Sequence, residues 1–390
     1  MSRRVLCVRL DNAGDVLLAG PAIRAVAAQA EVVLLAGPEG ESAARLLPGV
    51  SDVLVWRCPW IAQPPDPTTP ADIAALVTRL AAENLDAALI FTSFHQSPLP
   101  TALVLRMAGV PWIGAISTDY PGSLLDLRHQ LSDDLPEPER GAALATAAGF
   151  ARPPGDDGRL RVRTPLPAVA DLVGDEPYVV LHPGTSVPAR AWPAEHFRAA
   201  AGLLAAAGWQ VVVTGSPGER ELTRFVATPA AAPDAVPLAV STETATAALP
   251  TPGRVRDLGG RTVLVGLAGI LAGAAAVVVG NTGPAHLAAA VGTPVVSLFA
   301  PTVPAGRWRP YGVAHVLLGD QNAPCRNTRV TSCPYPGHPC LSSVLPSDVV
   351  EAVTHLAGGS GPDAVPSAPT PNLADQRVPI RTRIAQGVTS

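Results

Sequence analysis

The chain has 390 residues, of which 47% are hydrophobic and 15% are charged, and its net charge is −4. This length exceeds what one hydrophobic core usually holds, so we expect two domains, and the high apolar content argues against a disordered protein. The sequence contains no basic tract, which argues against a nucleic-acid partner.

The first half alternates short apolar runs with helical patterns, which predicts βαβ units and a parallel sheet. The expected strands are residues 5–10, 32–36, 53–56, 87–91 and 112–115, and the expected helices are residues 20–29, 42–47, 71–83 and 101–108. Residues 133–175 are rich in Pro, Asp and Gly around one alanine-rich helix at 139–149, and they mark a domain boundary.

The same alternation restarts at residue 178. The expected strands are residues 178–184, 209–215, 275–280 and 294–301, and the expected helices are residues 194–207, 219–227, 263–272 and 284–291. Residues 228–254 predict a surface excursion, and the Ser, Pro and Gly after residue 358 predict a disordered tail. We therefore expect an α/β protein with two doubly wound parallel sheets, in an N-terminal domain at 1–165 and a C-terminal domain at 176–357, followed by the tail at 358–390. In such sheets ligands bind beyond the carboxyl ends of the strands.

Localisation depends on two further stretches. The N-terminus is too polar for a signal peptide, and five cysteines do not suit a secreted disulfide scaffold in a chain this long, so we expect a cytoplasmic protein. Residues 262–280 carry no charge and are long enough to span a bilayer. We favour a short helix followed by a buried strand, because glycines divide the stretch and a polar, glycine-rich sequence follows it.

The stretch LDNAGDVLL places a carboxylate where the first strand passes into the first helix. Gly14 permits a close approach of the backbone to a ligand or a left-handed turn. Asp15 has two interpretations. It either caps the helix, or it faces the ligand cleft as a base that takes a proton from a hydroxyl.

Three further strand ends carry polar residues. In LHPGTSVPARAW, the small side chains and Arg190 suit phosphate oxygens, or they form a plain turn with a solvated arginine. In VVVTGSPGERE, Glu219 either caps a helix or accepts hydrogen bonds from a ribose diol. In VVVGNTGPAHL, a helix begins directly after Asn281 and Thr282, so its free N–H groups make a phosphate site. His286 lies on the first turn of that helix, either as a packing residue or within reach of the same anion.

Other motifs limit the chemistry. The sequence has no Asp-x-Asp pair, no G-x-G-x-x-G after the first strand and no G-x-S-x-G, which argues against a metal-chelated diphosphate, a nicotinamide cofactor and a nucleophile elbow, respectively. Cys325, Cys333, His338 and Cys340 could bind zinc, but their spacing matches no standard zinc pattern. A Pro-rich loop with free thiols is the favoured interpretation.

Taken together and in this order, four stretches resemble the motifs of glycosyltransferase family 9, the ADP-heptose:lipopolysaccharide heptosyltransferase family. They are RLDNAGDVLLAGPAIRAV, HPGTS…RAWPAEHF, TGSPGERE and GNTGPAHLAAAVGTPVVSLFAPT. The cysteine-rich stretch that ends in CLSSVLPSDVVEAV is also similar to the end of many members. The resemblance covers roughly residues 3–357.

The resemblance implies a GT-B fold, in which two Rossmann-like domains face each other. It also implies an inverting, metal-independent transfer of heptose or a related sugar from a nucleotide-diphosphate donor to a hydroxyl of a glycan or glycolipid of the cell envelope. No cofactor is implied, and peripheral association with the inner face of the cytoplasmic membrane fits such an acceptor. Two other classes remain open: a nucleotide-sugar epimerase-like GT-B enzyme and a non-catalytic nucleotide-sugar binding protein.

The resemblance also implies roles for individual residues. Asp15 corresponds to the presumed general base, with Asn12 and Gly14 on the acceptor side. The implied donor-binding residues are Thr185, Ser186, Arg190, Glu219, Asn281, Thr282, Gly283 and His286. Two positions depart from the family pattern, because Arg190 stands where members often have Lys and Asn281 where heptosyltransferases typically have Asp.

Overall fold

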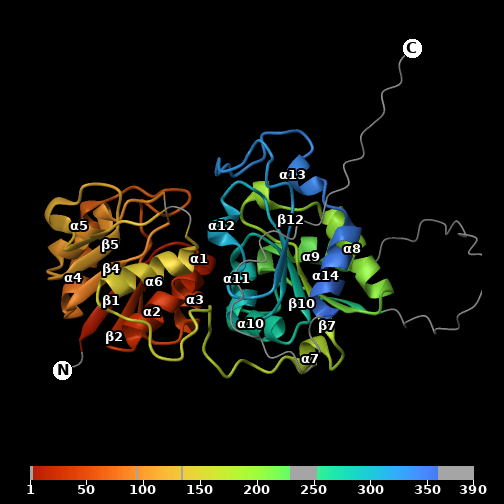
Figure 1. Ribbon diagram of the computed structural model, residues 1–390, viewed down its shortest axis with the longest axis horizontal. Helices are drawn as coiled ribbons and strands as arrows, with labels where there is room; N and C mark the ends of the chain where they lie inside the picture. The colour runs from red at the N-terminus through yellow and green to blue at the C-terminus, as the bar shows by residue number, and fades with distance from the viewer. Residues whose placement is uncertain (1–2, 94, 133–134, 229–252, 359–390) are drawn as a thin grey trace, which may run out of the picture.

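Figure 1 shows the computed structural model of the chain, which describes residues 3–93, 95–132, 135–228 and 253–358. Two six-stranded sheets, each with helices around it, lie side by side, one in each half of the chain. The expected tail and most of the expected surface excursion lie outside the described residues.

The first sheet has the strand order β3-β2-β1-β4-β5-β6, and all of its neighbouring strands are parallel. Its strands are β1 (Arg4–Arg9), β2 (Glu31–Ala36), β3 (Val50–Val55), β4 (Ala87–Ile90), β5 (Ile113–Ile116) and β6 (Leu127–His129). The helices of this half are α1 (Ala13–Leu18), α2 (Gly20–Ala27), α3 (Glu41–Leu46), α4 (Pro70–Ala82), α5 (Leu99–Met107) and α6 (Glu137–Ala147), with short 3₁₀ turns η1 (Pro38–Gly40) and η2 (Gly122–Leu124).

The second sheet has the order β12-β11-β10-β7-β8-β9, again all parallel. Its strands are β7 (Tyr178–His182), β8 (Gln210–Val213), β9 (Val255–Asp257), β10 (Ala276–Gly280), β11 (Val295–Leu298) and β12 (His315–Leu318). Its helices are α7 (Ala170–Val173), α8 (Ala194–Ala206), α9 (Arg220–Ala227), α10 (Leu264–Ala272), α11 (Gly283–Ala290), α12 (Ala305–Trp308), α13 (Pro339–Ser342) and α14 (Pro346–Gly358), with 3₁₀ turns η3 (Pro188–Arg190) and η4 (Pro217–Glu219).

Both sheets are doubly wound, so the expected fold class is confirmed. Counted within its own half, each sheet has the order 3-2-1-4-5-6, and its strand order reverses between the first and fourth strands. The apolar runs become strands because parallel sheets covered on both faces bury every position, as in β10, where all five residues are buried. Short edge strands such as β6, β9 and β12 were not predicted, since partly exposed edges lack such a run.

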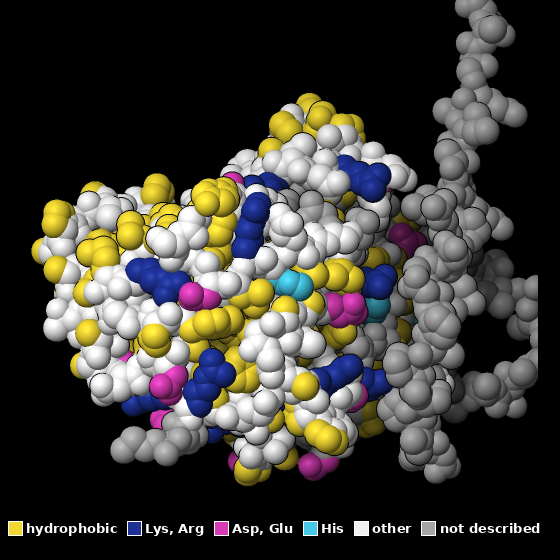
Figure 2. Space-filling model, turned by 60° about the vertical axis from the view of Figure 1, so that its left-hand side comes forward, with side chains coloured by type: hydrophobic (Ala, Val, Ile, Leu, Met, Phe, Trp, Pro, Cys, Tyr) yellow, Lys and Arg dark blue, Asp and Glu magenta, His cyan; other side chains and the backbone are white. Residues whose placement is uncertain are grey.

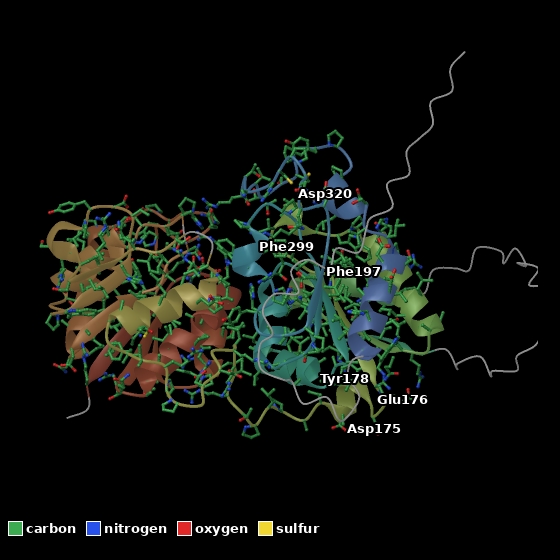
Figure 3. All side chains as sticks on the ribbon, in the orientation of Figure 1. Asp175, Glu176, Tyr178, Phe197, Phe299 and Asp320 are labelled. Carbon is green, nitrogen blue, oxygen red and sulfur yellow. The ribbon has the colours of Figure 1, made fainter. Side chains whose placement is uncertain are left out.

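The apolar stretch at 262–280 forms α10 and β10, as favoured above. None of the helices in the described part of the chain combines the length and apolar character needed to cross a bilayer. In the second half, Tyr178 at the start of β7 donates its hydroxyl to Ile270 O (2.6 Å), and Phe197 of α8 is fully buried (Figure 3).

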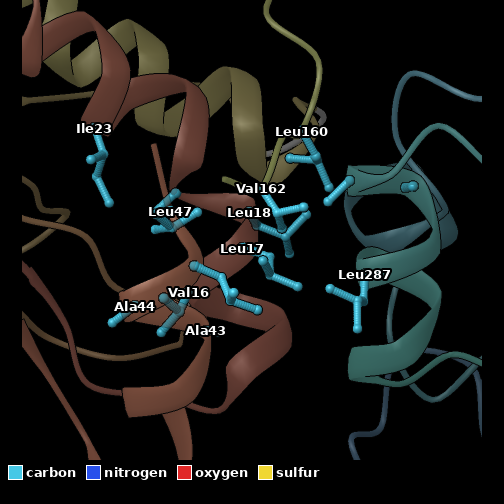
Figure 4. Packing of buried hydrophobic residues seen from close by; sticks show 14 of the residues in the cluster. Val16, Leu17, Leu18, Ile23, Ala43, Ala44, Leu47, Leu160, Val162 and Leu287 are labelled. Carbon is cyan, nitrogen blue, oxygen red and sulfur yellow. The ribbon is translucent and has the colours of Figure 1, made fainter. Parts of the chain in front are cut away.

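The two halves share a continuous apolar core. Leu17 and Leu18 of α1 belong to the same buried cluster as Leu287 of α11, and Leu160 and Val162 of the connecting segment join it (Figure 4). Burial of this apolar surface holds the first turns of α1 and α11 against each other. The packing therefore places the end of β1 opposite the end of β10.

Candidate functional site

The site lies where the two strand-order reversals face each other. α1 follows β1 in the first sheet, and α11 follows β10 in the second. Gly14 and Gly283 meet at the first turns of these helices, because a Cβ atom on Gly14 would lie 3.0 Å from Gly283 Cα and 3.0 Å from His286 Cδ2. This is tighter than ordinary contacts of a Cβ atom, so a glycine suits the close approach of the two helices.

Asp15 lies on the third position of α1 and is bound by an arginine. Arg9 Nη2 donates to Asp15 Oδ1 (2.9 Å) and to Ser93 Oγ (2.9 Å). The N-cap of α1 is the exposed Asn12, so capping is not what holds the Asp15 carboxylate. Asp15 is therefore oriented by a buried cation and remains partly exposed.

Arg9 was not predicted as a site residue. It ends β1, is 3% exposed and also lies 2.9 Å from Asp11 through its Nε. Burial opposes its charge, but Asp11, Asp15 and Glu137 outweigh burial, and the pKa of Arg9 is raised. The available signal was a charged residue directly after a buried apolar run, in RVLCVR.

Arg190 approaches the same place from the second half. Its Nη1 donates to Asn281 O (3.3 Å), while its buried Nε has no hydrogen-bond partner. Burial lowers the pKa of Arg190, and the negative charge of Asp15 opposes that shift. A partly buried guanidinium with an unused donor is suited to bind an anion.

His286 is buried on the first turn of α11, and its Nδ1 has no hydrogen-bond partner. Burial, and secondarily the charge of Arg190, lowers the pKa of His286 to about 4. The imidazole is therefore neutral near pH 7. His286 therefore packs in the core through its ring and still has Nδ1 available to a ligand.

The side chain of Asn281 holds the turn after β10 to the segment after β11. Its Nδ2 donates to Ala300 O (3.4 Å), and its Oδ1 accepts from Ala300 N (3.3 Å), so the amide pairs with the backbone just after β11. An aspartate could accept from Ala300 N but could not donate to Ala300 O when ionised. Asn281 thus uses both polar groups of its side chain within the protein.

The remaining donor-side residues lie at the neighbouring strand ends. Thr282 is the N-cap residue of α11, with its hydroxyl close to Gly280 O. Thr185 accepts from Val187 N (3.1 Å) in the turn after β7, and Ser186 is exposed beside it. The turn after β7 is adjacent to the turn after β10, because the two strands are paired.

Glu219 has the capping role that is one of its two interpretations. It accepts from Ser216 N (2.7 Å) in a capping box at η4. It also lies directly against Gly184, where a Cβ would overlap its carboxylate, and its charge acts on buried His182. The carboxylate therefore reaches the turn after β7 while it caps.

The cysteine-rich segment supports η3 instead of forming a metal cluster. Within the described residues no group of three His, Cys, Asp or Glu side chains could hold a metal ion, and the five cysteines are free thiols. His338 Nε2 lies 3.1 Å from Ala189 O, and Ala189 N donates to Thr331 O (2.9 Å). The segment thus anchors the turn that carries Arg190.

A groove of about 580 Å³ lies on the first half, next to the loop that follows β3. Trp56, Arg57 and Arg79 line it, together with Asp66 and Asp72. Arg57 is paired with Glu39 and Asp66, and Trp56 packs edge-on against Trp60. On the face shown in Figure 2, basic side chains lie in separate small groups, which agrees with the absence of a basic tract.

The geometry suits transfer of a group between two bound molecules. One carboxylate of the first half lies opposite a partly buried cation and a helix N-terminus of the second half. A carboxylate can take a proton from a nucleophile, and the opposite elements can stabilise a departing anion. Asp15, Arg190, Gly283 and His286, named from the sequence, are brought together, while Glu219 lies beside the neighbouring turn.

Residues 73–338 match the family model described as glycosyltransferase family 9 (heptosyltransferase). Lipopolysaccharide heptosyltransferase 1 of Pseudomonas aeruginosa is 36% identical over 168 residues, which are 43% of this chain and 40% of that protein. The match therefore spans less than half the length of this relative.

Two solved structures are similar over nearly the whole fold. The glycosyl transferase family 9 structure from Veillonella parvula has a TM-score of 0.68 at 15% identity, and the similarity covers 92% of this chain and 98% of that one. The E. coli heptosyltransferase WaaC with ADP-2-deoxy-2-fluoro heptose has a TM-score of 0.62 at 22% identity, with 90% and 99% covered. These similarities confirm the expected GT-B architecture.

Proposed function

Because the chain belongs to glycosyltransferase family 9, we propose that it transfers a heptose or a related sugar from a nucleotide-diphosphate donor to a hydroxyl of a glycan or glycolipid. The observation that carries the proposal is the position of Asp15, which the first half holds opposite Arg190 and the N-terminus of α11 in the second half. In this arrangement residues 1–165 bind the acceptor and residues 176–357 bind the donor.

The reaction proceeds in one displacement. The acceptor oxygen attacks the anomeric carbon and gives its proton to the Asp15 carboxylate, while the bond from that carbon to the diphosphate oxygen breaks. Attack from the face opposite the leaving group inverts the configuration. Arg190 and the first-turn N–H groups of α11 stabilise the nucleoside diphosphate that departs, so no metal ion is required.

Donor binding follows the strand ends of the second sheet. Thr185, Ser186 and Arg190 hold the diphosphate, Glu219 meets the ribose, and Thr282, Gly283 and His286 line the phosphate and sugar. An ADP-heptose-like donor is supported by the heptosyltransferase name of the Pseudomonas relative and by the ADP-sugar analogue in the structure of E. coli WaaC. Asn281 contributes by fixing the turn after β10 to Ala300.

Acceptor binding belongs to the first half. Asn12 and Gly14 lie on the acceptor side of Asp15, and the groove beside Trp56 and Arg57 offers an aromatic face and cations to a glycan. The names of the relatives favour a lipopolysaccharide-type acceptor, which would bring the protein to the inner face of the cytoplasmic membrane.

The direct test replaces Asp15 by Asn. We expect Asp15→Asn to abolish most sugar transfer while calorimetry shows nearly unchanged donor affinity, because the amide keeps the size of the side chain but cannot take the proton. Asp171→Asn in α7, an exposed carboxylate far along the chain, is the matched control and should keep full activity. An Asp15→Asn enzyme with the wild-type rate would refute the base assignment.

The donor is identified by a thermal-shift screen with ADP-, GDP-, UDP- and dTDP-sugars, because only a ligand of the folded state raises the melting temperature. ADP-heptose should give the largest shift. Isomerisation of the sugar without an acceptor would indicate an epimerase-like enzyme, and binding without turnover on any acceptor would indicate a non-catalytic protein.

A further inference from the structure

Behind Asp15, six charged side chains form one connected group. Arg9 touches Asp11 and Asp15 and lies 3.9 Å from Glu137 through its Nη1. Glu137 in turn lies 3.6 Å from Arg140 and 3.4 Å from Arg307. Arg9, Glu137, Arg140 and Arg307 are each 5% exposed or less.

This group crosses the boundary between the halves. Glu137 is the first residue of α6, which packs against α2 of the first half through Gly141 and Ala22. Arg307 lies in α12 of the second half, where its guanidinium stacks over Trp308 (5.9 Å). Among the described residues, Glu137 is the carboxylate that joins Arg9 to Arg307.

A second contact lies beside the bridge. Tyr311 Oη donates to Glu139 Oε1 (3.2 Å), so the turn that follows α12 also rests on the first turn of α6. The ion pair of Arg9 on α6 is with Glu137, whereas Glu139 accepts its hydrogen bond from Tyr311 in an exposed position. At the same interface, Glu137 is linked to Asp15 through Arg9, whereas Glu139 is not.

Stability alone does not account for the buried group. Removing six charges from water costs several kcal/mol per ion, and apolar residues of similar volume often stabilise a protein as well or better. Burial raises the pKa of Glu137, although Arg9, Arg140 and Arg307 each oppose that rise. The three arginines thus offset part of the cost of burying this carboxylate.

We propose that Glu137 is a positioning residue, which joins Arg9 of the first half to Arg307 of the second and so makes the orientation of Asp15 depend on the docking of α12. When α12 is in place, Arg307 balances Glu137, Glu137 holds Arg9, and Arg9 holds Asp15 towards α11. When α12 moves away, Glu137 binds Arg9 more strongly and draws it from Asp15. The base is thereby aligned only when both halves are together. This inference rests on the proposed function for its catalytic consequence, but the structural coupling stands independently.

The test uses Glu137→Gln, Arg307→Gln and the double variant in the full chain. Since small misplacement of a reacting group costs up to about 100-fold in rate, each single variant should lower kcat on the order of 10- to 100-fold while KM for the donor changes by less than about 3-fold. The double variant should be no slower than the slower single one, because both changes break the same bridge. Arg307→Lys, which keeps the charge, should recover part of the rate.

Glu139→Gln is the matched control, since it weakens the same interface without touching Arg9. It should retain kcat, with at most a small loss of melting temperature. Equal losses of kcat in Glu137→Gln and Glu139→Gln, or losses that multiply in the double variant, would overturn the proposal.

Hydrogen exchange separates this inference from the proposed function. Arg307→Gln should speed amide exchange in residues 10–18, although Arg307 lies in the other half, and Glu139→Gln should not. If the wild type transfers no sugar but this exchange response appears, the function fails and the coupling stands. If transfer occurs and residues 10–18 exchange identically in all variants, the coupling is wrong.

Discussion

Gly14 and Gly283 meet across the junction of the two halves, where a Cβ on Gly14 would lie 3.0 Å from Gly283 Cα. Real Cβ atoms rarely come so close to backbone, so a side chain at residue 14 requires its neighbours to shift by a few tenths of an ångström. Because Asp15 is the next residue, such a shift moves the proposed base relative to the donor side. The contact between two glycines therefore connects packing with chemistry.

The first prediction follows from that contact. Gly14→Ala should lower the transfer rate on the order of 10- to 100-fold, because α1 is pushed from α11. Gly202→Ala in α8 is the control, since a Cβ there meets nothing within 4 Å. That variant should keep its activity and gain about 0.5–1 kcal/mol of stability from helix propensity. Steady-state kinetics and urea denaturation measure both quantities, and an unimpaired Gly14→Ala enzyme would contradict the close approach.

The second prediction concerns the anion. Arg190→Met should weaken donor binding by about 1.5–3 kcal/mol, the range for hydrogen bonds to charged groups. Isothermal calorimetry with the donor and with the free nucleoside diphosphate measures this loss. Arg45→Met removes an exposed arginine paired with Glu41 on the first half and should bind normally. Equal affinities of the wild type and Arg190→Met would exclude Arg190 from the diphosphate site.

The third prediction concerns Asn281. Asn281→Asp should destabilise the fold by about 1–3 kcal/mol at pH 7, because an ionised carboxylate faces Ala300 O without a proton to donate. Its folded-state pKa would be raised, so stability should recover as the pH falls and the carboxyl becomes protonated. Asn84→Asp is the control, since Asn84 also donates to a backbone carbonyl but is exposed. Melting temperatures of Asn281→Asp and of the wild type at pH 7 and pH 5 test this: the difference between the two proteins should be smaller at pH 5.

The fourth prediction concerns acid stability. Burial is the main cause that lowers the pKa of His182 and of His286 from 6.5 to about 4. The unfolded chain therefore binds more protons than the folded one in this window, and stability should fall as the pH decreases from about 6.5 to about 4. Each imidazole accounts for up to about 3 kcal/mol of this loss.

Melting temperatures measured between about pH 6.5 and about pH 4 test whether stability falls with pH and whether the buried histidines cause the loss. His286→Asn should flatten the slope, whereas His355→Asn should not, because His355 is exposed near the end of α14. A slope that His286→Asn leaves unchanged would assign the acid sensitivity to other groups.

The sequence predicted those parts of the site that follow from strand ends. Asp15, Arg190 and His286 each lie in the turn or helix that follows a buried apolar strand, and parallel topology brings the ends of such strands to one edge of each sheet. The bridge from Arg9 to Arg307 could not be foreseen, because Glu137 and Arg307 are 170 residues apart and lie in different halves. Likewise, nothing in the local pattern pairs Asn281 with Ala300.

The secondary structure shows the same division. Long buried strands such as β7 and β10 were predicted, because a continuous run of apolar residues is typical of a strand that is buried on both faces of a sheet. The edge strands β6, β9 and β12 depend on pairing with a neighbour already in place, which periodicity along the chain does not reveal.

The burial of Glu137 between Arg9 and Arg307 also bears on how the protein responds to ionic strength. Dissolved ions screen charges that water reaches, such as the exposed pair Arg45–Glu41, but they do not enter a dry interior. Concentrated salt should thus leave the two halves joined and the carboxylate of Asp15 in place. Its effect should be confined to the encounter with charged molecules arriving from solution.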